Sequence, residues 1–168
     1  EMIVVDDSST DATAVVAAAH GATVLAAASP PAGWAGKPWA CHVGAEVATG
    51  THLLFLDADT WLAPDTLRRL LDEHATRGGI LSVQPHHRTE RAYEQLSAVF
   101  NVTSMMGTGA FAIGGAGPGA MAFGPCLITT VRDYRAVGGH AAVRNEVVED
   151  VRLARLYRAQ GLPVRCVG

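Results

Sequence analysis

The sequence predicts an α/β sandwich with a mostly parallel central sheet, a Rossmann-type arrangement in a single domain over residues 1–168. Short apolar runs alternate along the chain with longer stretches of helical period, and this alternation is typical of strands joined by helices. Hydrophobic residues make up 49% and charged residues 17% of the 168 residues, which is enough apolar material for one core. Two of the apolar runs end in acidic clusters, as expected where ligands bind beyond the carboxyl ends of strands.

The first half of the chain has clear strand and helix boundaries. Gly21 and Gly50 are placed to end helices, and the loop between them is marked by three prolines and two glycines. We expect, in order, strand 2–5, a helix from Ser9 or Thr10 to about His20, strand 22–26, loop 29–38, helix 39–49 and strand 52–56.

The second half continues the alternation. Pro64 is suited to the first turn of a helix, and Gly78 and Gly79 are suited to follow its end. We expect helix 64–76, strand 80–84, an apolar helix 93–106, a glycine-rich loop 107–119, strand 126–129, helix 148–160 and a strand-like run 163–168. Since the chain begins in one apolar run and stops in another, we expect it to be truncated at both ends of its fold.

Charge and cysteine content exclude several classes of protein. The net charge of −3 argues against a nucleic-acid-binding protein that relies on a broad basic field. The three cysteines are too widely spaced for a zinc site or a disulfide framework. No apolar run is long enough to cross a membrane.

Acidic pairs follow the two clearest strands. Asp6 and Asp7 follow the first, and Asp57 and Asp59 follow the strand that ends in Leu-Leu-Phe-Leu. Two carboxylates at the end of a buried strand suit a Mg²⁺ ion that also holds substrate phosphates. The alternative is that these aspartates only cap turns and helices.

A third acidic pair, Glu149-Asp150, opens the last predicted helix. Carboxylates in a first helical turn are favoured by the helix dipole and by arginines one turn later, so a structural role alone is a real alternative. The structural alternative weakens only when this pair is considered together with the other two acidic pairs.

The three acidic motifs, in this order and over nearly the whole chain, resemble the family 2 glycosyltransferases of GT-A fold. Further segments resemble the carotenoid-acid (diaponeurosporenoate-type) branch of that family: Gly-Trp-Ala-Gly-Lys-Pro-Trp-Ala at 33–40, Ser-Val-Gln-Pro-His-His at 82–87, Tyr-Glu-Gln-Leu-Ser at 93–97 and Val-Gly-Gly-His at 137–140. The resemblance implies an inverting transfer of a sugar from a UDP-sugar to a lipid-like, possibly carotenoid, acceptor.

The resemblance also assigns roles on the donor side. Asp6 and Asp7 match the motif that holds uracil, and Lys37 matches a basic position near the donor, although a surface lysine is the plain alternative. Asp57 and Asp59 match the Asp-x-Asp motif, which binds Mg²⁺ or Mn²⁺.

On the acceptor side, the resemblance makes Asp150 the catalytic base and Glu149 its neighbour. Gly138, Gly139 and His140 match a turn beside the acceptor. If the acceptor is a carboxylate, which is ionised near neutral pH, Asp150 would orient it more than deprotonate it. Apolar residues around the glycine-rich loop are expected to form core packing or an apolar channel: Phe100, Met105, Met106, Phe111, Ile113, Met121 and Phe123.

By the same resemblance, the chain lacks the family's first strand and its C-terminal region. Contact with the cytoplasmic face of the membrane would then come from parts of a longer protein.

Two other interpretations of the function remain open. One is a haloacid-dehalogenase-type phosphatase, which also has a strand followed by Asp-x-Asp, although Trp61 stands where that family has Thr or Val. The other is a non-catalytic nucleotide-binding module.

Overall fold

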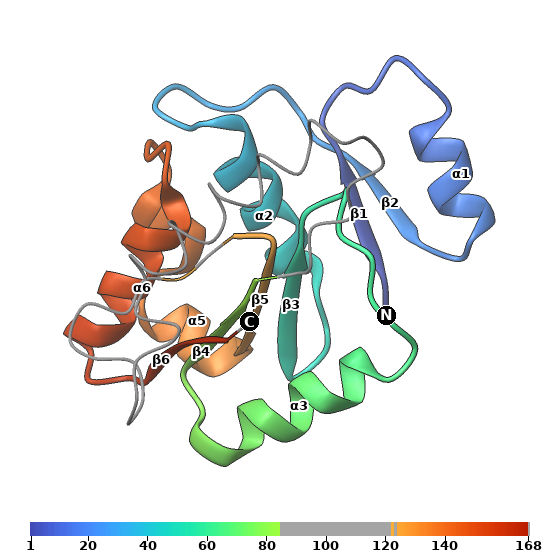
Figure 1. The fold of residues 1–168 in the computed structure, drawn as a ribbon. Helices are drawn as coiled ribbons and strands as arrows, with labels where there is room; N and C mark the ends of the chain where they lie inside the picture. The colour runs from blue at the N-terminus through green and yellow to red at the C-terminus, as the bar shows by residue number, and fades with distance from the viewer. Residues whose placement is uncertain (85–121, 123, 168) are drawn as a thin grey trace, which may run out of the picture.

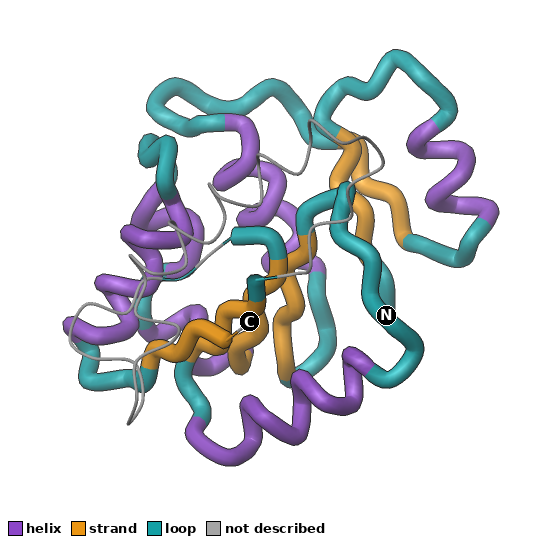
Figure 2. The backbone as a smooth tube through the Cα atoms, viewed as in Figure 1, coloured by secondary structure: helices purple, strands orange, loops and turns teal. Residues whose placement is uncertain are grey.

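The computed structural model describes residues 1–84, 122 and 124–167 (Figure 1). Helices alternate with strands along most of the chain (Figure 2). The elements are β1 Ile3–Asp6, α1 Thr13–Ala19, β2 Thr23–Ala26, α2 Gly36–Val47, β3 His52–Leu56, α3 Thr66–Arg77, β4 Ile80–Val83, β5 Cys126–Thr130, α5 Val131–Ala136, the 3₁₀ helix η2 Gly139–Val143, α6 Glu149–Ala159 and β6 Val164–Val167. No helix in the described ranges is long and apolar enough to cross a membrane.

The strands form two separate sheets. β1 pairs with β2 in parallel, and the larger sheet has the order β3-β5-β4-β6. In the larger sheet β3, β4 and β6 share one direction, whereas β5 is antiparallel to both of its neighbours. The predicted α/β class is confirmed, with β5 as the departure from a mostly parallel sheet. The sequence could not give its direction, because a strand buried on both faces is a continuous apolar run in either case.

Three predicted helix starts are wrong. α3 begins at Thr66, so Pro64 precedes the helix instead of lying in its first turn. α1 begins at Thr13, and neither Ser9 nor Thr10 caps it. α2 begins at Gly36, three residues earlier than predicted, because Pro38 lies in the first turn, where a helix needs no backbone N–H donor. The earlier start places Lys37 on the first turn of α2 instead of in a loop.

The main core lies between the large sheet and α6. Leu153 and Tyr157 of α6 are fully buried against Ile80 and Leu127. The Tyr157 hydroxyl forms a hydrogen bond of 2.8 Å with that of Thr129, so this polar group is satisfied inside the core. By contrast, no residue before Pro38 is buried. The predicted helix 93–106 and loop 107–119 lie outside the described residues.

Candidate active site

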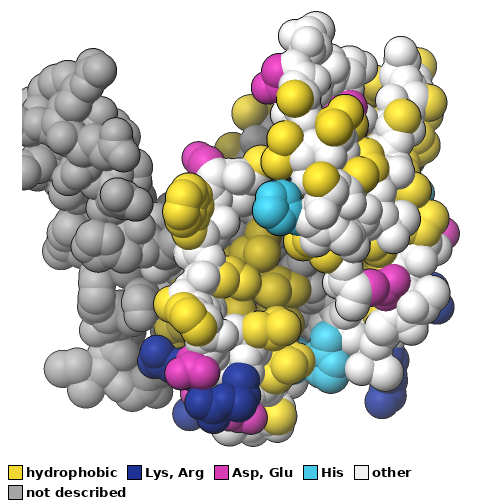
Figure 3. Space-filling view, turned by 90° about the vertical axis from the view of Figure 1, so that its right-hand side faces the viewer, with side chains coloured by type: hydrophobic (Ala, Val, Ile, Leu, Met, Phe, Trp, Pro, Cys, Tyr) yellow, Lys and Arg dark blue, Asp and Glu magenta, His cyan; other side chains and the backbone are white. Residues whose placement is uncertain are grey.

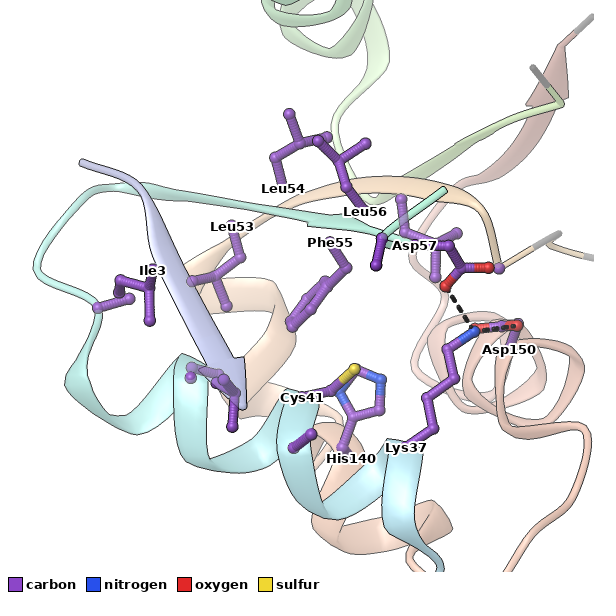
Figure 4. Close-up of a pocket in the computed structure, with 18 of the residues that line it drawn as sticks. Ile3, Lys37, Cys41, Leu53, Leu54, Phe55, Leu56, Asp57, His140 and Asp150 are labelled. Atoms are coloured by element: carbon purple, nitrogen blue, oxygen red, sulfur yellow. Dashed lines mark ion pairs between the residues drawn. The ribbon is translucent and has the colours of Figure 1, made fainter. Parts of the chain in front are cut away.

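One lysine joins acidic groups from two distant parts of the chain. Asp57 follows the end of β3, and Glu149 and Asp150 form the first turn of α6. The Lys37 Nζ lies 3.0 Å from Asp57 Oδ1, 3.0 Å from Glu149 Oε1 and 3.9 Å from Asp150 Oδ2. Figure 4 shows this side chain rising from α2 between the two acidic segments. The ammonium offsets the repulsion that three carboxylates would otherwise exert on one another.

The electrostatics of this cluster favour a base at Asp150. Burial raises the pKa of Asp150 to about 6, and the Glu149 and Asp57 charges add to this while Lys37 opposes it. Burial by itself lowers the pKa of Lys37, but the carboxylates of Asp150, Asp57 and Glu149 raise it more, so the lysine stays charged. Near neutral pH, Asp150 is therefore ionised but close to the pH at which it accepts a proton.

Gly124 leaves room for the Asp150 carboxylate. A Cβ atom at this position would lie 2.1 Å from Asp150 Oδ2 and 2.9 Å from Lys37 Nζ. Any side chain there would push the carboxylate out of its place. Sequence reasoning missed this residue, because nothing in the sequence marks one glycine near β5 as the neighbour of a side chain on α6.

His140 lies deep beside the cluster. Its backbone N–H donates to the Tyr134 hydroxyl at 3.0 Å, and its Nδ1 lies 2.8 Å from the same oxygen. Burial, together with the charges of Lys37 and His42, lowers the pKa of His140 to about 4, so the ring is neutral. The imidazole packs edge-on against Phe55 and lines the same pocket as Asp57 and Asp150.

Gly138 and Gly139 make this arrangement possible. Both have positive φ, 81° and 52°. A Cβ on Gly139 would lie 2.5 Å from the Tyr134 ring, so only glycine lets that ring reach His140. Gly138 and Gly139 therefore form the turn that positions His140 against Tyr134.

Comparisons with known proteins agree with the arrangement of the acidic motifs. The family model described as glycosyl transferase family 2 matches residues 1–113. The 4,4'-diaponeurosporenoate glycosyltransferases of Staphylococcus aureus strains MRSA252 and USA300 are each 40% identical over 169 residues, a match that covers 98% of this chain. The chain belongs to glycosyl transferase family 2. It spans 45% of the length of these two relatives.

Solved structures support the fold of this family 2 domain. A mannosyltransferase from Pyrobaculum calidifontis, solved with GDP-Man and Mn²⁺, has a TM-score of 0.68 at 23% identity, over 99% of this chain and 45% of that one. A mannosyl-3-phosphoglycerate synthase from Rubrobacter xylanophilus has a TM-score of 0.53 at 19% identity, over 99% of this chain and 54% of that one. The expected GT-A fold is confirmed.

The remaining acidic residues of the family 2 motifs lie outside the cluster. Asp6, at the end of β1, accepts the Ser9 N–H at 3.2 Å. Asp7 is exposed, and its Oδ2 would lie 3.1 Å from a Cβ on Gly36, just before Lys37. The structure therefore places Asp7 beside the first turn of α2.

The proposed metal ligands differ in their surroundings. Asp57 is engaged by Lys37, whereas Asp59 is exposed in the turn after β3. The described residues contain no group of three or more side chains placed to hold a metal. Asp57 and Asp59 supply one or two carboxylates, a donor set that suits a Mg²⁺ or Mn²⁺ ion completed by substrate phosphates and water.

Parts of the resemblance and one sequence prediction lie outside the described ranges. These are residues 85–87 and 93–97 of the resembling segments, and the apolar residues Phe100, Met105, Met106, Phe111, Ile113, Met121 and Phe123.

Proposed function

We propose that this domain, within its longer protein, transfers a sugar with inversion from a UDP-sugar to a carboxylate or hydroxyl on a lipid-like acceptor. The observation that carries the proposal is the meeting of Asp57 with the Glu149–Asp150 pair across Lys37. Asp57, Asp150 and Lys37 line one pocket. This supports the proposal that Asp57 would act on the donor side, Asp150 as the base and Lys37 as a cation for anionic phosphates.

In this proposal the acceptor oxygen attacks the anomeric carbon as the bond from that carbon to the diphosphate oxygen breaks. The new bond forms on the opposite face of the sugar, and the bonding electrons leave with UDP. Asp150 accepts the proton of a hydroxyl acceptor through its carboxylate. With a carboxylate acceptor no proton has to leave, and Asp150 then serves to orient the acceptor.

The donor side is assigned to three groups. Asp59, with Asp57, would hold the divalent cation, and such an ion supplies neutralisation of the charge that develops on the leaving diphosphate. Lys37, about half exposed, lies where it can hold the diphosphate on one side and fix Asp57 and Glu149 on the other. Asp6 and Asp7 would contact the nucleobase.

The relatives' names support the acceptor class. The Staphylococcus aureus proteins are named for 4,4'-diaponeurosporenoate, a carotenoid carboxylate. We extend that chemistry to this domain and propose that the longer protein meets its apolar acceptor at the cytoplasmic membrane surface. The mannosyltransferase of similar fold was solved with GDP-Man, so the donor nucleoside has to be tested.

The test uses the longer protein with a polyene carboxylic acid or a polyene alcohol and either UDP-glucose or GDP-Man, with Mg²⁺ or Mn²⁺. We expect a glycosylated product from the UDP-sugar. NMR of this product should show that the anomeric configuration is inverted relative to the donor. UDP binding without transfer would show a non-catalytic nucleotide module. Release of phosphate from a simple phosphoester would support the phosphatase instead.

A further inference from the structure

Lys37 is the only lysine among the 168 residues, because all the other cationic side chains apart from histidine are arginines. The two residue types are not interchangeable. A lysine ammonium is a compact charge on a flexible stem, whereas an arginine guanidinium is a planar fork that holds carboxylates in a fixed geometry. Lys37 extends from the first turn of α2 into the acidic cluster. The one small and adaptable cation of the chain therefore lies beside a proposed ligand of the divalent metal.

The two closest partners of Lys37 differ in burial. The ammonium lies 3.0 Å from an oxygen of each, but the side chain of Glu149 is 6% exposed and that of Asp57 is 33% exposed. Apart from this ion pair, Glu149 Oε1 has no hydrogen-bond partner among the described residues. Loss of the pair would leave a buried charge without compensation, whereas water can reach Asp57. Lys37 is therefore held firmly by Glu149 and more loosely by Asp57.

The pocket offers the ammonium few other places to go. Seen from the side that carries β1 and β2, the surface is hollowed, and hydrophobic side chains line the hollow (Figure 3). Among the described residues, the carboxylates that line the cavity are those of Glu1, Asp57 and Asp150. Glu1 is bound to the backbone just before β3, whereas Asp57 follows the other end of that strand. Lys37 therefore stays within the acidic cluster unless an anionic ligand enters.

Asp57 is shared by two cations in the proposed site. Its Oδ1 contacts the Lys37 ammonium, and the same carboxylate is proposed to help Asp59 hold the metal. Cations on the two oxygens of one carboxylate lie close together, and a divalent ion repels an ammonium twice as strongly as a monovalent ion does. The ammonium and the metal therefore compete for Asp57.

We propose that Lys37 exchanges with the divalent metal at Asp57. Lys37 neutralises Asp57 before the metal binds, and it pivots about Glu149 to release Asp57 when the metal arrives. The inference rests on one part of the proposed function, the assignment of Asp57 and Asp59 to the metal. It does not depend on the sugar, the acceptor or the stereochemistry of transfer.

The exchange links metal binding to donor binding. Without a donor, the ammonium lowers the affinity for the metal, because it has to be displaced from Asp57. With a donor present, the displaced ammonium gains a diphosphate oxygen as a new partner while Glu149 still holds it. Metal and diphosphate therefore strengthen each other's binding, and by linkage the two effects are equal in size.

The test measures Mn²⁺ binding to the longer protein without nucleotide, by electron paramagnetic resonance of the free ion. It compares wild type, Lys37→Gln, Asp57→Asn and the double variant. We expect Lys37→Gln to bind Mn²⁺ about five- to tenfold more tightly than wild type, because no ammonium has to leave Asp57. In the Asp57→Asn background the same change should alter the affinity by less than about twofold, because the shared carboxylate is absent.

An equal gain in both backgrounds would overturn the exchange, since Lys37 would then act only through its positive charge. The absence of a gain in either background would also overturn it. Arg152→Gln is the matched control, because Arg152 lies on α6 and pairs with Glu146 at 3.7 Å. Its loss should leave the Mn²⁺ affinity within about twofold of wild type, because exposed charges are screened by salt.

A second measurement keeps the native lysine. In the longer protein labelled with ¹³C at lysine Cε, the Lys37 signal is the one that Lys37→Gln removes. Saturating Mg²⁺ should move this signal toward its position in metal-free Asp57→Asn, where Lys37 has already lost its ion pair with residue 57. A signal that stays at its metal-free position at saturation would overturn the proposal. Neither readout requires sugar transfer, so failure of the exchange and failure of the transfer reaction can be told apart.

Discussion

The two ends of the candidate site belong to regions that differ in how many of their residues are buried. Asp57, Glu149 and Asp150 are attached to the larger sheet and α6, where Leu153 and Tyr157 are fully buried. Asp6 and Asp7 are attached to β1, in a region without a single buried residue. Asp57, Glu149 and Asp150 are therefore positioned by elements that carry a buried core, whereas Asp6 and Asp7 are positioned by elements without buried residues.

The largest effect should come from Asp150→Asn in the longer protein. Loss of the proton acceptor should lower transfer to a hydroxyl acceptor by about 10²–10⁴-fold. The effect on a carboxylate acceptor should be smaller, because no proton leaves. Stability should rise slightly above pH 6, because the variant removes a carboxylate whose raised pKa reports a cost of ionisation.

Asp133→Asn is the matched control, since Asp133 is a first-turn carboxylate on α5. It should leave transfer near normal. If Asp150→Asn also keeps the wild-type rate on a hydroxyl acceptor, Asp150 is only a helix-start residue.

A pair of substitutions of apolar residues by alanine compares how strongly packing stabilises the two regions. Leu153→Ala should lower the free energy of unfolding by about 2–5 kcal/mol, as for other buried leucines. Val4→Ala, in a half-buried position of β1, should cost less than about 1 kcal/mol in residues 1–168. Urea unfolding of both variants measures the difference. Equal costs would show that β1 is packed as firmly as α6.

Much of the acidic cluster could be predicted from the sequence. Asp57 and the Glu149–Asp150 pair lie at element ends that an α/β fold brings to one side, and the structure does bring them together. The link through Lys37 could not be predicted, because it depends on α2 beginning at Gly36. The sequence placed that boundary three residues later.

The rest of the site required tertiary information. Asp57 and Asp59 look equivalent in the sequence, yet only Asp57 is engaged by Lys37. His140 looked like a residue beside the acceptor, and the two preceding glycines fold it into contact with Tyr134.

The pH dependence of transfer tests the electrostatics of the cluster. Because the pKa of Asp150 is raised to about 6 by burial, kcat/KM for a hydroxyl acceptor should fall about tenfold per pH unit below that value. Lys37→Gln should move this limb to higher pH, because the lysine charge lowers the pKa of Asp150. An unmoved limb would show that another group controls it.

The raised pKa of Asp150 affects stability in the opposite direction to activity. Activity falls below about pH 6, whereas the contribution of Asp150 to stability falls above it. The ordinary value of 3.8 applies to the unfolded chain, so between pH 3.8 and about 6 the folded protein binds more protons at Asp150. The contribution of Asp150 is therefore most favourable below 3.8 and is lost as the pH rises through about 6. Thermal melts of wild type and Asp150→Asn should diverge over this window, with the variant gaining at the higher pH.

The smallest effect is expected at the nucleobase end. Asp7 is exposed and lies beside the first turn of α2, so Asp7→Ala should leave the melting temperature unchanged. If Asp7 accepts a hydrogen bond from uracil, UDP binding by the longer protein should weaken by about three- to tenfold, as for the loss of one partly solvated hydrogen bond. Asp11→Ala is the control, because Asp11 is also exposed and accepts hydrogen bonds from Thr13 near α1. Calorimetric titration with UDP and with GDP should show the loss for UDP alone. An equal loss in both variants would mean that the whole region around β1 affects UDP binding. The difference between the two ends of the site would then reflect the folding of that region and not a direct contact between Asp7 and uracil.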